Sequence, residues 1–327
     1  MSESHPAGDP LLRVRNLAVD FGARAAVRDV DFDLFAGEAL GLVGESGSGK
    51  STLARAILRL VRAARGTAQW CGQDLLSCSA AELRQRRRDL QIVFQDPLAS
   101  LNPRMTVGDA IAEPLRIFEP LLNAHARRGR VGEMLERVGL TAAMMGRYPH
   151  EFSGGQCQRI GIARAMILRP KLLVCDEPVS SLDVSIQGQI VNLLLDLQRD
   201  AGTAMLFISH NLAIVRHLSH RILVMYSGSL VEIATSDVLF TSPVHPYTRA
   251  LLAAVPSVSP QRRTLPTRRL LIEAPAPSRA MAGCAYRERC GYALGVCATT
   301  VPPLAEAAPG HAVACHRAGE LIAGEPA

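Results

Sequence analysis

One short glycine-rich stretch constrains this chain more than any other part of it. It reads Gly44-Glu45-Ser46-Gly47-Ser48-Gly49-Lys50-Ser51 and is followed by Thr52. Residues 38–43 are typical of a buried strand, and apolar residues at helical spacing follow the stretch at Leu53, Ile57, Leu58 and Val61. In such a strand–loop–helix setting, curled backbone N–H groups and the positive end of the helix converge on one anion. The sequence therefore predicts a phosphate-binding P-loop.

Lys50 and Ser51 carry the most specific chemistry of this loop. In P-loops the lysine reaches the β- and γ-phosphates, and the hydroxyl that follows ligates Mg²⁺. We therefore expect ATP to bind at Gly44, Glu45, Ser46, Gly47, Ser48, Gly49, Lys50, Ser51 and Thr52. Phe21, at the end of a predicted strand, is the candidate for stacking on the adenine ring, and the alternative is a phenylalanine of the core. A glycine turn without nucleotide is the alternative for the loop itself.

Three further segments place polar side chains directly after predicted strands. Residues 171–178 are predicted as a buried strand ending in two adjacent carboxylates, Asp176 and Glu177, where neighbouring side chains point in different directions. We expect Asp176 to hold Mg²⁺ and Glu177 to polarise the attacking water. Gln95 lies in a loop at the end of the strand that begins at residue 91. The strand predicted at 204–210 ends in His210, at a strand end where open α/β sheets bind their ligands.

A second anion-binding helix start is predicted at Ser153-Gly154-Gly155-Gln156, which opens a helical run to Leu168. Residues 11–20 and 26–35 are predicted antiparallel strands, residues 98–146 are mostly helical in pattern, and residues 221–226 and 229–234 form a hairpin. A chain of 327 residues has room for one large α/β domain and a small appendage.

The charge and hydropathy of the chain limit its partners. The net charge is +6, with arginine clusters at residues 84–88, 127–130 and 262–269 that lack interleaved aromatic side chains. Solvated faces, or contacts with anionic lipid and a membrane partner, are therefore favoured over nucleic acid. Because the first ten residues are polar and no apolar run reaches the roughly 18 residues of a membrane span, we expect a cytosolic chain that docks on a membrane-embedded partner.

Taken in order, these motifs resemble those of ABC-transporter ATPase subunits. The resemblance covers residues 11–255, and its motifs are the P-loop, the Gln95 loop, residues 152–156, the strand ending at Asp176 and Glu177, residues 181–183, and His210. The segments 94–105 and 245–252 resemble the oligopeptide/dipeptide importer branch, most closely the second of its two paired ATPases. Cys157 stands where that family usually has arginine.

This resemblance implies the fold class and the assembly. The fold is an α/β P-loop NTPase (RecA-like) core with an antiparallel β subdomain, a helical signature subdomain at about 98–165, and a small C-terminal extension at 256–327. Two ATPase subunits, as a heterodimer, would hold two ATP molecules between them. Contacts to the partner's ATP would come from Ser153, Gly154, Gly155, Gln156 and Asp183. Glu177, His210 and Gln95 would be catalytic, and Ser51, Gln95 and Asp176 would hold Mg²⁺.

Eight cysteines in a cytosolic chain argue against a disulfide framework. Four of them are scattered and are interpreted as small core or surface residues. The other four are Cys284, Cys290, Cys297 and Cys315, and they lack the C-x₂₋₄-C spacing of structural zinc sites. Similar cysteine-bearing tails occur in the importer branch, so the resemblance favours a [4Fe–4S] cluster there over zinc or unmetallated thiols.

The function implied is ATP hydrolysis that powers peptide uptake through a separate membrane permease of two subunits, served by a solute-binding protein outside the cytoplasm. The chain would lie at the cytoplasmic face of the membrane. Two alternatives stay open on the residues: an importer ATPase for nickel or another small solute, and a soluble ABC ATPase acting on nucleic acid or ribosomes. The second usually carries a long coiled coil or a second cassette, and this sequence shows neither.

Overall fold

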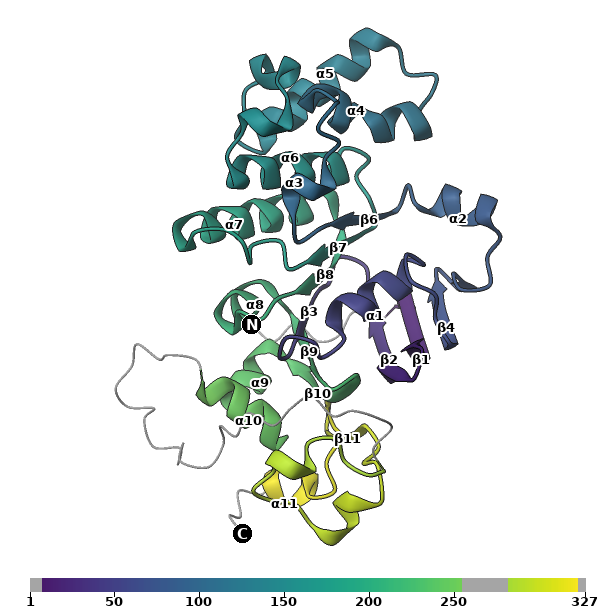
Figure 1. Ribbon diagram of the computed structural model, residues 1–327, viewed down its shortest axis with the longest axis vertical. Coiled ribbons are helices and arrows are strands. Elements are labelled where there is room, and N and C mark those ends of the chain that lie inside the picture. Colours follow the sequence, from purple (N-terminus) through teal and green to yellow (C-terminus); the bar gives the residue numbers. More distant parts are fainter. Residues whose placement is uncertain (1–7, 255–281, 323–327) are drawn as a thin grey trace. The chain divides into compact units, whose positions relative to one another are not determined.

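The computed structural model describes residues 8–254 and 282–322 of the chain (Figure 1). These residues belong to two compact units that alternate along the sequence. The helical unit comprises Met1–Leu11, Leu34–Ala39 and Ser77–Ser209, and the P-loop unit comprises Leu12–Asp33, Leu40–Leu76 and His210–Ala327. This division differs from the predicted domains at 11–255 and 256–327, which stay a prediction. The arginine cluster at 262–269 lies outside the described residues.

The helical unit contains three parallel strands in the order β6 (Leu90–Val93), β7 (Leu172–Asp176) and β8 (Ala204–Ile208). Val174 is aligned with Ile92 on one side and with Leu206 on the other. Every residue of β7 and β8 is buried, as expected for parallel strands with both faces covered. The buried strands predicted within 171–178 and 204–210 are therefore confirmed, and they end at Asp176 and Ile208.

Helices make up most of the rest of this unit (Figure 1). They are α2 (Ala80–Arg86), α3 (Pro97–Ser100), α4 (Val107–Phe118), α5 (Ala124–Arg137), α6 (Gly154–Met166) and α7 (Val184–Ala201), with short 3₁₀ turns η1 (Ala142–Gly146) and η2 (Pro149–Glu151). Several begin at a side-chain cap: the Thr106 hydroxyl accepts from the Asp109 N–H at 3.2 Å, and the Asn123 amide oxygen accepts from the Ala126 N–H at 2.8 Å. The helical pattern predicted from residue 98 onward is confirmed.

The P-loop unit contains two sheets. The first has the order β2 (Arg24–Leu34), β1 (Leu12–Phe21), β4 (Arg65–Trp70) and β5 (Gln73–Asp74), with β1 antiparallel to β4. In the second, β3 (Ala39–Val43) runs parallel to β9 (Arg221–Tyr226), which pairs antiparallel with β10 (Ser229–Thr235). The helices of this unit are α1 (Lys50–Ile57), α8 (Leu212–Leu218), α9 (Ser236–Thr241), α10 (Pro246–Ala253) and α11 (Ala318–Ile322).

The C-terminal extension adds strands to this second sheet, a feature that the sequence did not predict. Strand β12 (His311–Val313) pairs antiparallel with β10, and β11 (Ala305–Ala308) pairs with β12. The buried carboxylate of Glu232 links β10 to β12, because it lies 2.7 Å from the His311 Nε2. It also accepts from the Val244 N–H at 2.8 Å. The described part of the extension, residues 282–322, is thus continuous with the P-loop unit.

Acid sensitivity of the P-loop unit follows from His245, the N-cap of α10. Burial lowers the pKa of His245 from its ordinary value of 6.5 to about 4, and the nearby Glu232 acts in the opposite direction. Its Nδ1 accepts from the Tyr247 N–H at 3.0 Å, as a neutral ring does. In the unfolded chain the His245 ring is protonated below about pH 6.5, whereas in the folded chain it is protonated only near pH 4. The contribution of His245 to stability is therefore lost as the pH falls from about 6.5 to about 4.

We expect this histidine to lower the free energy of unfolding by about 2 kcal/mol between pH 7 and pH 5. The His245→Asn variant keeps a capping acceptor without a titrating ring, so it should lack this part of the pH dependence. Urea unfolding of both proteins at the two pH values measures the difference. Equal losses of stability in the two proteins would contradict the assignment.

Candidate functional site

The backbone of the predicted P-loop takes conformations that glycine alone adopts freely. Gly47 and Gly49 have φ angles of +76° and +104°. A Cβ on Gly44 would lie 2.1 Å from the carbonyl oxygen of Met225, and one on Gly49 would lie 2.3 Å from that of Ala26. The loop backbone therefore packs directly against the backbone at Met225 and Ala26, and no side chain fits at Gly44 or Gly49.

Lys50 is the seventh residue of this loop and opens α1. It is 4% exposed, and its Nζ donates to the carbonyl oxygens of Gly44 and Glu45, each at 2.9 Å. The N-cap of α1 is Gly49, which makes no side-chain capping bond. The first turn, with Ser51 and Thr52, thus combines a buried ammonium group with the backbone N–H groups of a helix start. This donor set fits a polyphosphate.

Phe21 ends β1 and is 53% exposed. The alternative that it belongs to the core is therefore wrong. An exposed aromatic ring in the same unit as the loop is suited to stacking on a base, and the adenine contact stays a prediction.

Gln95 and Glu177 are brought together in the helical unit. The Gln95 Nε2 donates to the Glu177 Oε2 at 3.3 Å, although the two residues are 82 positions apart. Asp176, the last residue of β7, is 0% exposed. Glu177 takes a left-handed backbone conformation with φ +48°, and its N–H donates to the carbonyl oxygen of Ile208 at 3.1 Å. Such a conformation is costly for a residue other than glycine and is typical of functional sites.

His210 is exposed and lies just beyond β8. It belongs to the P-loop unit, whereas Gln95, Asp176 and Glu177 belong to the helical unit. The next residue, Asn211, caps α8 through its side chain, which accepts from the Ala213 N–H at 3.1 Å. The role of His210 in catalysis stays a prediction.

The second predicted anion site is the N-terminus of α6. Ser153 and Gln156 form a capping box, in which the Ser153 N–H donates to the Gln156 Oε1 at 3.0 Å. Ser153 and Gly154 are exposed. A Cβ on Gly155 would lie 2.9 Å from the Ile186 Cγ2, so this loop packs closely against the first turn of α7.

Asp183, the N-cap of α7, is exposed, and the neighbouring Val184 is 84% exposed. Such exposure is high for an apolar side chain. The starts of α6 and α7 therefore lie together in one unit, because Gly155 packs against Ile186. Their exposed residues are Ser153, Gly154, Asp183 and Val184.

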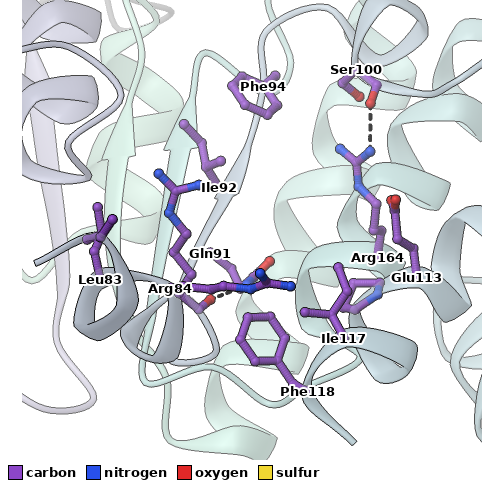
Figure 2. A pocket seen from close by; sticks show the side chains of 13 residues that line it. Leu83, Arg84, Gln91, Ile92, Phe94, Ser100, Glu113, Ile117, Phe118 and Arg164 are labelled. Carbon is purple, nitrogen blue, oxygen red and sulfur yellow. Dashed lines mark hydrogen bonds between the residues drawn. The ribbon is translucent and has the colours of Figure 1, made fainter. Parts of the chain in front are cut away.

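A cavity of about 650 Å³ lies in the helical unit, between α2, β6 and α4 (Figure 2). Apolar side chains from all three elements line it, among them Leu83, Ile92 and Ile117. Its charged lining residues are Arg84, Arg87, Arg164 and Glu113. Burial lowers the pKa of Arg164. The Arg164 guanidinium donates to the carbonyl oxygen of Ser100 at 2.6 Å. Phe94 and Ser100, on either side of Gln95 in the sequence, also line the cavity.

The structure also gives Glu45 partners that the sequence did not indicate. The Glu45 N–H donates to the Tyr247 hydroxyl at 2.8 Å, and its carboxylate pairs with Arg289. These partners are 202 and 244 positions away. Tyr247 lies in the importer-like segment 245–252, but nothing in that segment or around Arg289 points to Glu45. No signal in a single sequence would have identified them.

The four cysteines of the C-terminal extension do not fit a metal centre as they are placed. Among the described residues, which include all four, no three His, Cys, Asp or Glu side chains are grouped as a metal ion requires. Burial raises the pKa of the Cys284, Cys290 and Cys315 thiols, that of Cys290 to about 11. The expected [4Fe–4S] cluster, and equally zinc, is therefore not supported. Of the scattered cysteines, Cys157 and Cys175 are buried, as expected for core residues.

Within the described ranges, no helix combines the length and apolar character needed to cross a membrane.

Comparisons with known proteins match this set of features. A family model described as "ABC transporter" matches residues 27–180, and one described as "Oligopeptide/dipeptide transporter, C-terminal region" matches residues 231–297. The chain is 54% identical over 297 residues to the oligopeptide transport ATP-binding protein OppF of Salmonella typhimurium, covering 90% of this chain and 89% of that protein. It is 49% identical over 319 residues to OppF of Haemophilus influenzae, covering 93% and 96%.

A solved structure is also similar. The dimeric ATP-binding cassette MJ0796, in a post-hydrolysis state bound to ADP and Pi, superposes with a TM-score of 0.63 at 27% sequence identity. The match covers 69% of this chain and 98% of that one.

Proposed function

The chain belongs to the ATP-binding subunits of ABC transporters, and from this premise we propose that it powers peptide uptake through a separate membrane permease. Its family hydrolyses ATP to drive transport. The choice of peptides as the solute is supported by the relatives, which are oligopeptide transport proteins, and by the match of the C-terminal region at residues 231–297. The single observation that carries the proposal is the glycine cradle around the buried Lys50.

The residues divide the chemistry of hydrolysis among them. Lys50 and the N–H groups at the start of α1 hold the phosphates, and Phe21 stacks on the adenine. Ser51, Gln95 and Asp176 would hold Mg²⁺, which would supply positive charge to the phosphates. Glu177 accepts a proton from the attacking water, and Gln95, within hydrogen-bond reach of its carboxylate, keeps that carboxylate oriented. His210 contacts the γ-phosphate. Such catalysis consists mainly of positioning and charge stabilisation.

The second ATPase subunit docks on the helix starts of α6 and α7. Ser153, Gly154, Gly155 and Gln156 offer an N-terminal anion site, and Asp183 lies beside it. The exposure of Ser153, Gly154 and Val184 supports a covering partner. We expect this partner to be a different ATPase, so that each ATP lies between the P-loop of one subunit and the α6 start of the other.

The cavity between α2, β6 and α4 takes a short segment of the permease. Its apolar lining suits one face of an amphipathic helix, and the three arginines suit an acidic side chain on that helix. Phe94 and Ser100 line the cavity and flank Gln95, so an occupant contacts the segment that carries a catalytic residue. This arrangement couples the permease to hydrolysis.

The Ile117→Glu variant tests this docking site. Ile117 lines the cavity and is 46% exposed, and a carboxylate there would be desolvated by an apolar partner. We expect binding to the permease to weaken by about 10-fold or more, with basal ATP hydrolysis unchanged. Leu121→Glu is the matched control, because Leu121 is 98% exposed and does not line the cavity. Equal retention of both variants on permease-containing membranes would exclude this docking site.

These partners locate the chain at the cytoplasmic face of the membrane, together with two permease subunits and a solute-binding protein on the other side. ATP and Mg²⁺ are its cofactors, and nucleic acid is not among its partners.

Uptake of a labelled peptide by cells with and without the gene tests the proposed function. Loss of peptide accumulation on deletion, restored by the wild-type chain and not by Lys50→Ala, is the expected result. If deletion left peptide uptake unchanged and abolished nickel uptake, the transported solute would be nickel and not peptides.

A further inference from the structure

The C-terminal extension reaches the P-loop through one arginine. Arg289, at the end of the short 3₁₀ turn η5 (Arg287–Arg289), donates through Nη1 to the Glu45 Oε2 at 2.9 Å and through Nη2 to the Glu45 Oε1 at 3.0 Å. Two parallel N–H···O bonds of this kind fix orientation as well as distance. Both residues belong to the P-loop unit, and Glu45 is the second residue of the glycine-rich loop.

A cluster of aromatic side chains holds Arg289 in place. Its guanidinium lies 5.9 Å from the ring centre of Tyr226 and 5.8 Å from that of Tyr286. Tyr286 is 1% exposed, and its ring meets that of Tyr226 edge-to-face at 5.1 Å. The Arg289 side chain is itself 14% exposed, against 43% for that of Glu45. The arginine is thus the more firmly packed partner, and the loop residue is held against it.

The main chain of Glu45 is fixed from the same cluster. Its N–H donates to the Tyr247 hydroxyl at 2.8 Å, and the Tyr247 ring packs on those of Tyr226 and Tyr286. The carbonyl oxygen of Glu45 accepts from Lys50. The N–H, the carbonyl oxygen and the carboxylate of Glu45 therefore each have a partner. Lys50 is close to Glu45 in the sequence, whereas Arg289 is 244 positions away.

We propose that Arg289 is a positioning residue of the nucleotide site, through which the C-terminal extension sets the affinity of the loop for ATP. The inference rests on the proposed binding of ATP by this loop. Without Arg289, the loop would carry an unpaired carboxylate next to the binding position of a polyanion, and the two would repel each other. With Arg289, that charge is neutralised and the loop keeps the conformation in which its N–H groups converge.

The Arg289→Ala variant should therefore bind ATP about 5- to 10-fold more weakly, the range expected for a partly exposed, charge-assisted pair. The rate of hydrolysis at saturating ATP should change less than about twofold, because Arg289 does not touch the reacting atoms. Isothermal titration of the full chain with ATP gives the Kd, and phosphate release gives kcat and KM. Arg289→Lys, which keeps the charge without the bidentate fork, should recover part of the affinity.

A double-mutant cycle with Glu45→Gln separates this role from a merely structural one. In the Glu45→Gln background no carboxylate needs neutralising, so adding Arg289→Ala should raise the Kd by less than about twofold. If Arg289 served only to stabilise the extension, the loss would be the same in both backgrounds, and the proposal would be overturned. If Arg289→Ala folds poorly, Arg289→Lys takes its place in the cycle, and the loss of affinity should again be smaller in the Glu45→Gln background.

Arg317→Ala is the matched control, because Arg317 pairs with Glu320 inside the same extension at 2.6 Å. It should leave the Kd for ATP unchanged, and an increase equal to that of Arg289→Ala would overturn the proposal. A wild-type chain that binds no ATP would refute the proposed function itself. A wild-type chain that binds ATP as tightly as Arg289→Ala would refute only the inference drawn for Arg289.

Discussion

Replacing Glu177 by glutamine should lower kcat for ATP hydrolysis by about 10²- to 10⁴-fold, the range usual for loss of a positioned general base. The amide has nearly the shape of the carboxylate, so the contact with the Gln95 side chain and the left-handed turn at φ +48° should persist. It cannot accept a proton from water at neutral pH. Binding of ATP, which depends on the P-loop, should stay within about twofold of wild type.

Because ATP still binds and is not consumed, this variant should accumulate as a closed dimer with its partner subunit. Phosphate release under steady-state conditions measures the loss in rate, and size-exclusion chromatography with ATP measures the dimer. Glu136→Gln is a suitable control, since Glu136 is an exposed residue of α5. Near-normal turnover in Glu177→Gln would show that another group activates the water.

The Lys50→Ala variant should lose nucleotide binding itself, by about 100-fold, because it removes a buried ammonium group from the phosphate cradle. The cradle keeps its backbone N–H groups, but it loses the charge that we propose pairs with the β- and γ-phosphates. Hydrolysis at cellular ATP concentrations should then be undetectable. Titration with ATP measures the affinity directly.

This chain offers an unusually clean control for that experiment, because Lys50 and Lys171 are its only lysines. Lys171 is 60% exposed and pairs with Asp89 at 3.4 Å. Lys171→Ala should therefore leave ATP binding unchanged. In addition, ATP should protect Lys50, and not Lys171, from acylation by an amine-reactive reagent, as read by mass spectrometry. Equal protection of both lysines would place the nucleotide elsewhere.

Features that depend on short stretches of the chain were predictable. The glycines, Lys50 and Ser51 act within one loop, so their spacing alone specifies the cradle. The strand that ends at Asp176 and Glu177 is recognisable because a parallel strand buried on both faces is a continuous apolar run. The helix start at Ser153 is recognisable because a capping box needs only residues three apart.

The prediction about the four cysteines of the extension was not supported, and the reason is physical. Spacing along the chain restricts where thiols lie only when they share one short turn, as in a zinc knuckle. Here the cysteines are separated by five, six and seventeen residues, so the fold of the extension decides their positions. In that fold no three such side chains among the described residues are grouped for a metal ion.

By itself, then, the sequence determined the glycine-rich loop, the strand ends that carry the proposed catalytic side chains, and the family to which they point. Only the tertiary structure decided that Arg289 meets Glu45, that His311 meets the buried Glu232, and that the extension continues the sheet through β12. The physical reason is distance along the chain. Local motifs follow from backbone geometry over a few residues, whereas a pair 244 positions apart forms only when strand register and core packing bring its two segments together.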